Sequence, residues 1–140
     1  KKILSILIIL ICALVSCNKR MLETGEGNLP VLGGEIWYKV SGTGKGTPLV
    51  LIHGGPGASV STETFLTLGN DRQVIRYDQL GCGKSTYTED TTLFTIERKV
   101  LELDSLRKAL GIDKWNLMGH SFGAIIALEY YAAYPNHVTS

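Results

Sequence analysis

The sequence Gly-His-Ser-Phe-Gly at residues 119–123 constrains the fold most, because it lies between a short β-like segment and a long apolar helix. The segment before it, residues 116–118, is too short for a helix, and residues 124–134 after it are mostly apolar. A Gly-x-Ser-x-Gly turn between strand and helix is typical of a nucleophile elbow, in which the serine stands at the tip of a sharp turn. The pattern therefore predicts an exposed Ser121 at a helix N-terminus, where free N–H groups favour negative charge.

A second glycine-rich segment, His-Gly-Gly-Pro-Gly at residues 53–57, follows the apolar run 48–52, which predicts a parallel strand buried on both faces. Acyl transfer needs hydrogen-bond donors aimed at an oxyanion, and glycine lets a backbone N–H approach the substrate closely. In hydrolases with a nucleophile elbow, one donor is the amide after the serine and the other lies in the loop after the third strand. These positions are Phe122 and Gly55. The alternative is an ordinary turn, since glycine and proline cluster in turns of every kind.

A third segment, Tyr-Asp-Gln-Leu-Gly-Cys-Gly-Lys-Ser at residues 77–85, follows the strand-like residues 73–76. Together with His-Gly-Gly-Pro-Gly and the stretch 93–123, it resembles the proline iminopeptidases, which are serine peptidases of the α/β-hydrolase fold. The resemblance extends from about residue 34 to residue 138. It implies that Ser121 is the nucleophile and that the amides of Gly55 and Phe122 form the oxyanion hole.

The same resemblance implies that Asp78 and His53 order the loops in which they lie. The remaining motif positions are glycines and a proline, namely Gly54, Pro56, Gly57, Gly119 and Gly123. Three residues depart from the family pattern. Leu80 stands where arginine is common, Phe122 where many members carry tryptophan or tyrosine, and His120 where many carry glycine or another small residue. These differences concern the substrate more than the chemistry.

Strand and helix patterns alternate along the chain. They predict strands at 35–40, 48–52, 73–76 and 115–118, and helices at 58–68, 95–110 and 124–134. This alternation predicts a doubly wound, mostly parallel α/β sheet, as in the α/β-hydrolase fold. Catalytic loops of such a sheet lie at the carboxyl ends of the parallel strands, where His53, Asp78 and Ser121 all fall.

The helix expected at residues 95–110 has Thr95 as a suitable N-cap and Gly111 just after its last turn. Its expected buried face consists of apolar residues at helical spacing: Ile96, Val100, Leu103, Leu106 and Leu110. We expect Asp104 to be a solvated acid and His120 to be buried beside the elbow.

The chain has 140 residues, whereas single α/β domains of this kind commonly exceed ~200 residues. The triad of this fold follows the order serine, acid, histidine. After Ser121, the only acid is Glu129, within the helix, and His137 follows that helix. We therefore expect the N-terminal half of an enzyme that is inactive as this piece alone. The expected division is a signal peptide at 1–16, a lipidated tether at 17–30 and the α/β-hydrolase part at 31–140.

The N-terminus has the pattern of a targeting segment: two lysines, an apolar core at 3–15 and Leu-Val-Ser-Cys at 14–17. This last sequence resembles the lipobox of bacterial lipoproteins, in which cleavage precedes a cysteine that is then acylated. The resemblance implies lipid attachment at Cys17 and an exported protein anchored to a membrane, in the periplasm or at the outer surface. The alternative is an uncleaved anchor helix with Lys19 and Arg20 as its basic flank.

Charge and cysteine usage narrow the function classes. The net charge is +1 without a basic stripe, so nothing indicates nucleic-acid binding. The three histidines are isolated and the cysteines form no Cys-x-x-Cys pair, so no metal or other cofactor is expected. Cys82 lies in a glycine turn without an adjacent histidine, which disfavours a cysteine nucleophile. With Cys17 lipidated and Cys12 removed with the signal peptide, no second cysteine remains to pair with Cys82, so no disulfide is expected.

The leading hypothesis is a serine hydrolase that releases an N-terminal residue, typically proline, from short peptides. A small ester or amide is the alternative substrate, for an esterase, lactonase or epoxide-hydrolase-like member of the same fold, because fold alone does not settle substrate. The rival from another class is an inactive lipoprotein remnant.

Overall fold

The computed structural model describes residues 21–55 and 63–140. The expected signal peptide, Cys17, Pro56 and Gly57 therefore lie outside the described residues. The described strands are β1 (Gly25–Val31), β2 (Gly34–Ser41), β3 (Gly46–Ile52), β4 (Arg72–Tyr77) and β5 (Asn116–Gly119). The described helices are η1 (Glu63–Asn70), η2 (Thr91–Leu93), α2 (Ile96–Ala109), α3 (Phe122–Ala133) and η3 (Pro135–His137).

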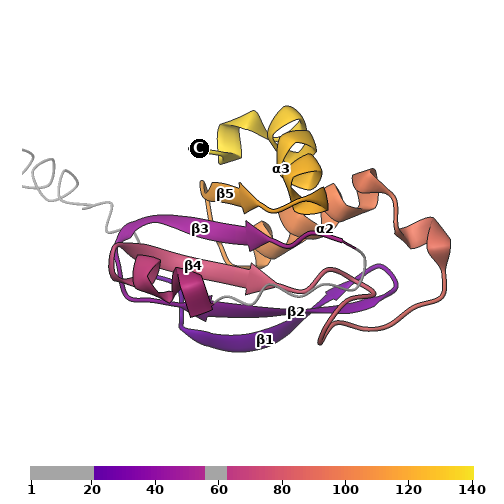
Figure 1. Ribbon diagram of the computed structural model, residues 1–140, viewed down its shortest axis with the longest axis horizontal. Coiled ribbons are helices and arrows are strands. Elements are labelled where there is room, and N and C mark those ends of the chain that lie inside the picture. Colours follow the sequence, from indigo (N-terminus) through magenta and orange to yellow (C-terminus); the bar gives the residue numbers. More distant parts are fainter. Residues whose placement is uncertain (1–20, 56–62) are drawn as a thin grey trace, which may run out of the picture.

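The strands form one mixed sheet in the order β1-β2-β4-β3-β5 (Figure 1). β3 is central to the parallel part, because it pairs in parallel with β4 on one side and β5 on the other. β1 and β2 add an antiparallel flank next to β4. The α/β sheet predicted from the sequence is confirmed, and the carboxyl ends of β3, β4 and β5 come together at one end of the molecule.

Both faces of the sheet are covered, as expected of a doubly wound fold. Along β3, Val50 and Ile52 face the larger core with α2 and α3, whereas Leu49 and Leu51 face a smaller cluster. That smaller cluster includes Phe65 of η1, which lies in front of the sheet in Figure 1. The continuous apolar run of β3 is therefore explained by burial on both sides.

α2 begins as predicted, with Thr95 as its N-cap. The Thr95 hydroxyl oxygen accepts a hydrogen bond of 3.3 Å from the Arg98 N–H, which satisfies one of the free donors of the first turn. Val100, Leu103 and Leu106 are buried against the sheet, which confirms the predicted apolar face. The expectation for Asp104 was wrong: this residue is only 2% exposed, because Arg107 and Tyr130 contact it inside the protein.

The expected tether over residues 17–30 is wrong for its last part, because Gly25–Val31 form β1. Leu29 and Val31 are partly buried while the residue between them is exposed, and Leu29 pairs with Ile36 of β2. That intervening residue, Pro30, lacks an N–H donor and is tolerated because β1 is an edge strand. Pairing with β2 thus orders a stretch whose glycines and proline make it look like a loop.

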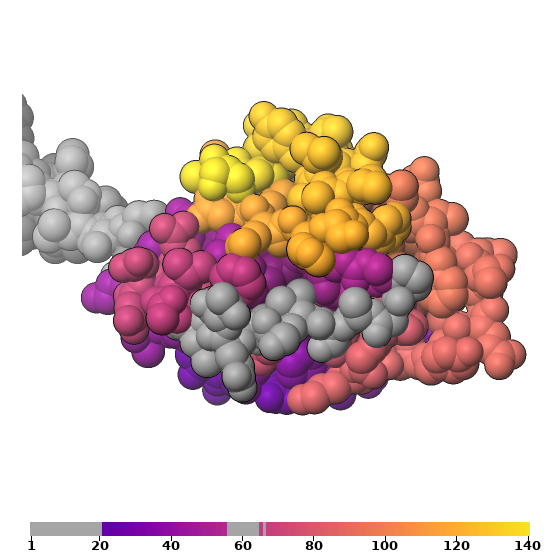
Figure 2. All heavy atoms as spheres, in the orientation of Figure 1, coloured from indigo at the N-terminus to yellow at the C-terminus, as the bar shows by residue number. Residues whose placement is uncertain are grey.

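The opposite edge of the sheet already has a partner. After α3 and η3, the Thr139 N–H donates to the Trp115 carbonyl at 2.9 Å, and the Leu117 N–H donates to the Ser140 carbonyl at 2.8 Å. Figure 2 shows this C-terminal stretch (yellow) lying beside α3 on the surface. Within residues 21–55 and 63–140, no helix is both long and apolar enough to cross a membrane.

Candidate active site

Ser121 occupies the turn between β5 and α3 in an unusual backbone conformation. Its φ is 53° and its ψ is −121°, and it is the only non-glycine residue with positive φ in the described part of the chain. Such a conformation costs on the order of 1–3 kcal/mol and persists where the surrounding structure imposes it. Ser121 is the N-cap of α3, but its side chain makes no capping hydrogen bond. The exposed hydroxyl is thus available for other chemistry.

The two glycines of the elbow are required by the close approach of neighbouring backbones. A Cβ atom at Gly119 would collide with the carbonyl oxygen of Gly123, and one at Gly123 would collide with the carbonyl oxygen of Ile52. Gly119 is therefore explained by the close approach of the start of α3 within the elbow, and Gly123 by packing of the elbow against β3.

The loop after β3 packs directly on the elbow. A Cβ atom at Gly54 would lie 2.5 Å from the His120 carbonyl oxygen and 2.7 Å from the Ser121 Cβ atom. In the other direction, the His120 N–H donates to the Ile52 carbonyl at 3.0 Å. Gly55, the next residue, has φ of 59°, which glycine adopts without cost. The proposed oxyanion donors, at Gly55 and at the start of α3, are thus carried by two elements in contact.

His53 is buried and holds two loops together. Its Nε2 atom accepts a hydrogen bond of 3.0 Å from the Gln79 N–H, and the Gln79 side-chain amide donates to the His53 carbonyl at 2.9 Å. Its Nδ1 atom lies 3.1 Å from the Gly54 carbonyl oxygen. Burial lowers the pKa of His53, which favours the neutral ring. Because Nε2 accepts from the Gln79 N–H and Nδ1 faces the Gly54 carbonyl, we assign the ring proton to Nδ1. Both ring nitrogens are engaged in bracing, which leaves neither for Ser121.

Asp78 orders the loop that follows β4. Its Oδ2 atom accepts a hydrogen bond of 2.8 Å from the Lys84 N–H, and its carbonyl oxygen accepts one of 2.5 Å from the Ser85 hydroxyl. The side chain is buried beneath the turn that it closes. This geometry is that of a loop-ordering residue, the role that the family resemblance implies.

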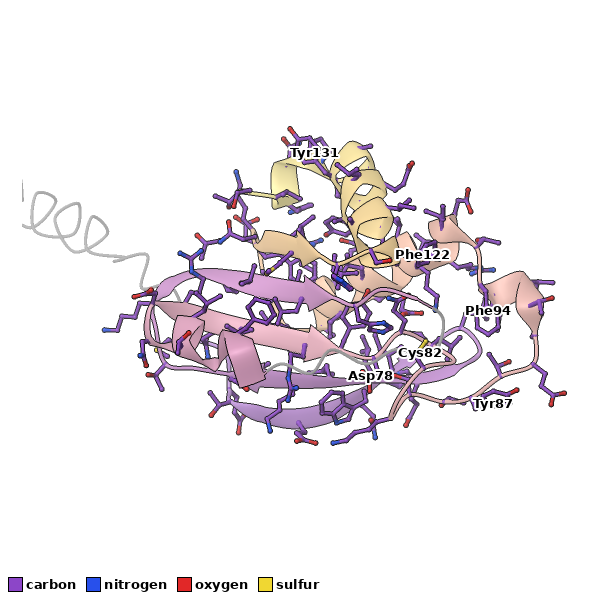
Figure 3. All side chains as sticks on the ribbon, in the orientation of Figure 1. Asp78, Cys82, Tyr87, Phe94, Phe122 and Tyr131 are labelled. Carbon is purple, nitrogen blue, oxygen red and sulfur yellow. The ribbon has the colours of Figure 1, made fainter. Side chains whose placement is uncertain are left out.

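A cavity of about 620 Å³ opens beside the two proposed oxyanion donors. Besides Gly55 and Phe122, its wall includes Cys82, Tyr87, Phe94 and Lys99. Figure 3 shows Phe122, Cys82, Phe94 and Tyr87 at the carboxyl end of the sheet, whereas Tyr131 lies on the outer side of α3. Sequence reasoning missed Tyr87 and Phe94, and the available signal was the presence of two aromatic residues in or beside a polar loop.

The other histidines differ from one another. The side chain of His120 is exposed, so the expectation that it is buried was wrong: it sits at the tip of the turn beside Ser121. The Nδ1 atom of His137, in η3, lies 2.8 Å from the Asp113 carbonyl oxygen. Over the residues that the structure describes, no three histidine, cysteine or acidic side chains gather as a metal site.

Comparison with known proteins agrees with this arrangement. The family model described as "alpha/beta hydrolase fold" matches residues 47–140. The proline iminopeptidase of Heyndrickxia coagulans is 44% identical over 117 residues, which cover 82% of this chain and 41% of that protein. The chain thus spans about two fifths of the length of the curated relatives that it matches.

Solved structures show the same likeness. The proline iminopeptidase-related protein of Thermus thermophilus superposes with a TM-score of 0.74 at 32% identity, over 82% of this chain and 42% of that one. An epoxide hydrolase of Vigna radiata reaches a TM-score of 0.75 at 22% identity, over 84% and 38%, a likeness of fold alone. From the family match over residues 47–140 and the elbow geometry, the chain belongs to the alpha/beta hydrolase fold family.

Proposed function

We propose that this chain carries the nucleophile of a serine hydrolase that releases N-terminal residues, typically proline, from short peptides. The observation that carries the proposal is the conformation of Ser121: a positive φ at the start of α3, with an uncommitted hydroxyl. The relatives named proline iminopeptidase support the substrate class.

In the proposed reaction, the Ser121 hydroxyl attacks the carbonyl carbon of the scissile amide and loses its proton to a general base. The oxyanion that forms accepts hydrogen bonds from the N–H groups of Gly55 and Phe122, and the helix dipole of α3 favours the same charge. Collapse of the tetrahedral intermediate expels the amine, and water then hydrolyses the acyl-enzyme.

We propose that the general base and the acid that orients it are supplied by residues outside this chain. Two of the described histidines are committed elsewhere: His53 to Gln79 and His137 to the Asp113 carbonyl. The chain spans about two fifths of the relatives' length, so this base is sought in the full-length protein. We also expect residues 1–140 alone to be inactive.

The test is covalent labelling of the full-length protein by a fluorophosphonate probe, together with turnover of a prolyl-amide substrate. Ser121→Ala should abolish labelling and nearly all turnover without unfolding the protein. Ser105→Ala is the matched control, because Ser105 is exposed on α2 and only donates to the Leu101 carbonyl. Persistent labelling after Ser121→Ala would place the nucleophile elsewhere. Hydrolysis of simple esters without that of prolyl amides would keep Ser121 and favour the esterase alternative.

We also propose that Cys17 is acylated and anchors the protein to a membrane, on the strength of the Leu-Val-Ser-Cys sequence and its apolar core. A palmitate analogue should label the wild-type protein but not Cys17→Ala. Equal labelling of the two would refute the lipobox and favour the uncleaved anchor.

A further inference from the structure

Two buried charges of α2 hold the backbone of one loop residue, Leu80. The Lys99 ammonium donates a hydrogen bond of 2.8 Å to the Leu80 carbonyl, and the Glu102 Oε1 atom accepts one of 3.2 Å from the Leu80 N–H. The Lys99 Nζ and Glu102 Oε2 atoms lie 3.5 Å apart, and the two side chains are 5% and 6% exposed. We call this arrangement the Leu80 clamp.

Stability alone does not account for a charged clamp. Burying two ions costs several kcal/mol in desolvation, and apolar residues of similar volume often replace such a pair with no loss of stability. The clamp does satisfy a backbone N–H and a carbonyl that would otherwise be buried without partners. Hydrogen bonds to charged groups are stronger than neutral ones, and the bond from Lys99 to the Leu80 carbonyl is short, at 2.8 Å, which suits accurate placement of a loop.

The clamp is connected to the elbow by a continuous series of contacts. Gln79 precedes Leu80, and it holds His53 through both its N–H and its side chain. His53 in turn faces the Gly54 carbonyl, and Gly54 packs against Ser121. The position of Leu80 thus bears on the loop that carries Gly55.

The clamp also lies in the wall of the cavity beside the elbow. Lys99 lines this cavity together with Gly55 and Phe122. Its ammonium lies 5.5 Å from the centre of the Phe94 ring, so an aromatic residue of the same wall shields the charge. A change in the clamp therefore acts at the edge of the proposed site.

We propose that Lys99 and Glu102 are positioning residues for the oxyanion donor at Gly55. They hold Leu80, and Leu80 places Gln79 so that His53 keeps one orientation and one tautomer. This inference rests on the proposed function of Ser121. Since an oxyanion donor acts in the transition state, the loss of the clamp should lower kcat and leave KM nearly unchanged.

The decisive variant in the full-length protein is Lys99→Met combined with Glu102→Met, which removes both charges and leaves neither unpaired. A misplacement of about 1 Å caused by a mutation away from the chemistry can cost about 100-fold in rate, so we expect a fall in kcat of up to that size on a prolyl-amide substrate. Glu102→Gln keeps an acceptor for the Leu80 N–H and should retain most of the activity. Asp104→Asn, on the same helix but facing α3, should lower the melting temperature without changing kcat.

A second readout does not depend on catalysis. In the wild-type protein, the ¹⁵N shifts of the His53 ring should show a protonated Nδ1 and an unprotonated Nε2, and the Gln79 amide should exchange slowly. The double variant should give mixed tautomers and faster Gln79 exchange, while the amides of α3 are unaffected. If the double variant does not fold, Lys99→Met combined with Glu102→Gln, which also leaves no buried charge unpaired, is compared in the same way.

Unchanged kcat and an unchanged His53 tautomer in the folded double variant would overturn the proposal. So would a loss of stability with normal kcat, because the clamp would then be only structural. If the wild-type protein reacts with no fluorophosphonate, the proposed function of Ser121 fails instead. In that case the His53 shifts and the Gln79 exchange still decide whether the clamp orders the loop.

Discussion

The two halves of α2 each bury a pair of opposite charges three residues apart, but the pairs have different surroundings. Near the helix start, Lys99 and Glu102 lie 3.5 Å apart and enclose the backbone of Leu80. Near its end, Arg107 and Asp104 are in direct contact at 2.9 Å. The first pair faces a loop at the carboxyl end of the sheet, and the second faces α3. The same spacing on one helix therefore serves two purposes.

The pair near the helix end fastens neighbouring elements. The Tyr130 hydroxyl of α3 donates to the Asp104 Oδ1 atom at 3.1 Å, and an Arg107 nitrogen donates to the Ile112 carbonyl at 2.7 Å. Exposed Lys108 adds a contact of 2.8 Å to the second oxygen of Asp104. These partners lie on α2, on α3 and just after α2, away from the proposed site, so we infer that this pair stabilises the fold.

The two acids also differ in their pKa directions. Burial raises the pKa of Glu102 above its ordinary value, in spite of Lys99. Burial alone would also raise the pKa of Asp104, but hydrogen bonds from Lys108, Arg107 and Tyr130 hold it below its ordinary value. At Asp104 the three donors outweigh the effect of burial on the pKa, whereas at Glu102 burial outweighs the effects of Lys99 and the Leu80 N–H.

Removal of Asp104 is expected to have the largest effect on stability. Asp104→Ala leaves Arg107 buried without its counter-charge, and breaking a buried pair in this way costs about 3–5 kcal/mol in the free energy of unfolding. Urea unfolding of the full-length protein measures this loss. Lys108→Ala is the control, with a loss of about 0.3–0.5 kcal/mol, because Lys108 is exposed. Similar losses for the two variants would contradict the structural role of the buried pair.

A smaller effect is expected at Tyr130. Tyr130→Phe keeps the packing of the ring and removes two hydrogen bonds to charged groups, the one donated to Asp104 and the one accepted from Arg107. Each such bond is worth about 1.5–3 kcal/mol, so we expect a loss of at least that size. Tyr131→Phe is the matched control on the same helix, and since its side chain is exposed we expect a change within about 0.5 kcal/mol. Equal effects would mean that the contact between Tyr130 and Asp104 does not couple α2 to α3.

The smallest effects are expected in the pH dependence of stability, with opposite signs at the two acids. Glu102 contributes stability below its ordinary pKa of 4.5, and this is lost as the pH rises through its raised value. Asp104 contributes stability above its ordinary pKa of 3.8, and this is lost as the pH falls through its lowered value.

The test compares the unfolding free energy of each amide variant with that of the wild type. Relative to the wild type, Glu102→Gln should gain stability as the pH rises above 4.5, because only the wild type is then penalised for ionising. Asp104→Asn should lose stability, relative to the wild type, as the pH rises toward 3.8. Difference curves of the same slope would refute the contrast between the two pairs.

The features predicted correctly were those that depend on nearby residues. The elbow is predicted by five consecutive residues, and α2 is predicted by one N-cap residue and by apolar residues at helical spacing. The burial of Lys99, Glu102 and Asp104 was not predicted, because a charged residue on a helix usually faces water. Their partners, Leu80 and Tyr130, are about 20 or more residues away, and only the fold brings them into contact.

Contacts between residues distant in the sequence also explain why β1 and the exposure of His120 were not predicted. β1 is ordered by pairing with β2, so glycine and proline in its own sequence hide it. The His120 side chain was expected to be buried because it adjoins the elbow, yet a residue at the tip of a sharp turn is lifted out of the core. Local chemistry predicts the motif, and long-range pairing decides the exposure of its neighbours.

The positive φ of Ser121 has a consequence for how such a protein can change over generations. Glycine adopts this conformation without cost, so Ser121→Gly would relieve a strain on the order of 1–3 kcal/mol. The polypeptide would then be more stable without its proposed nucleophile than with it. Stability and the proposed activity therefore make opposite demands on the residue at this one position.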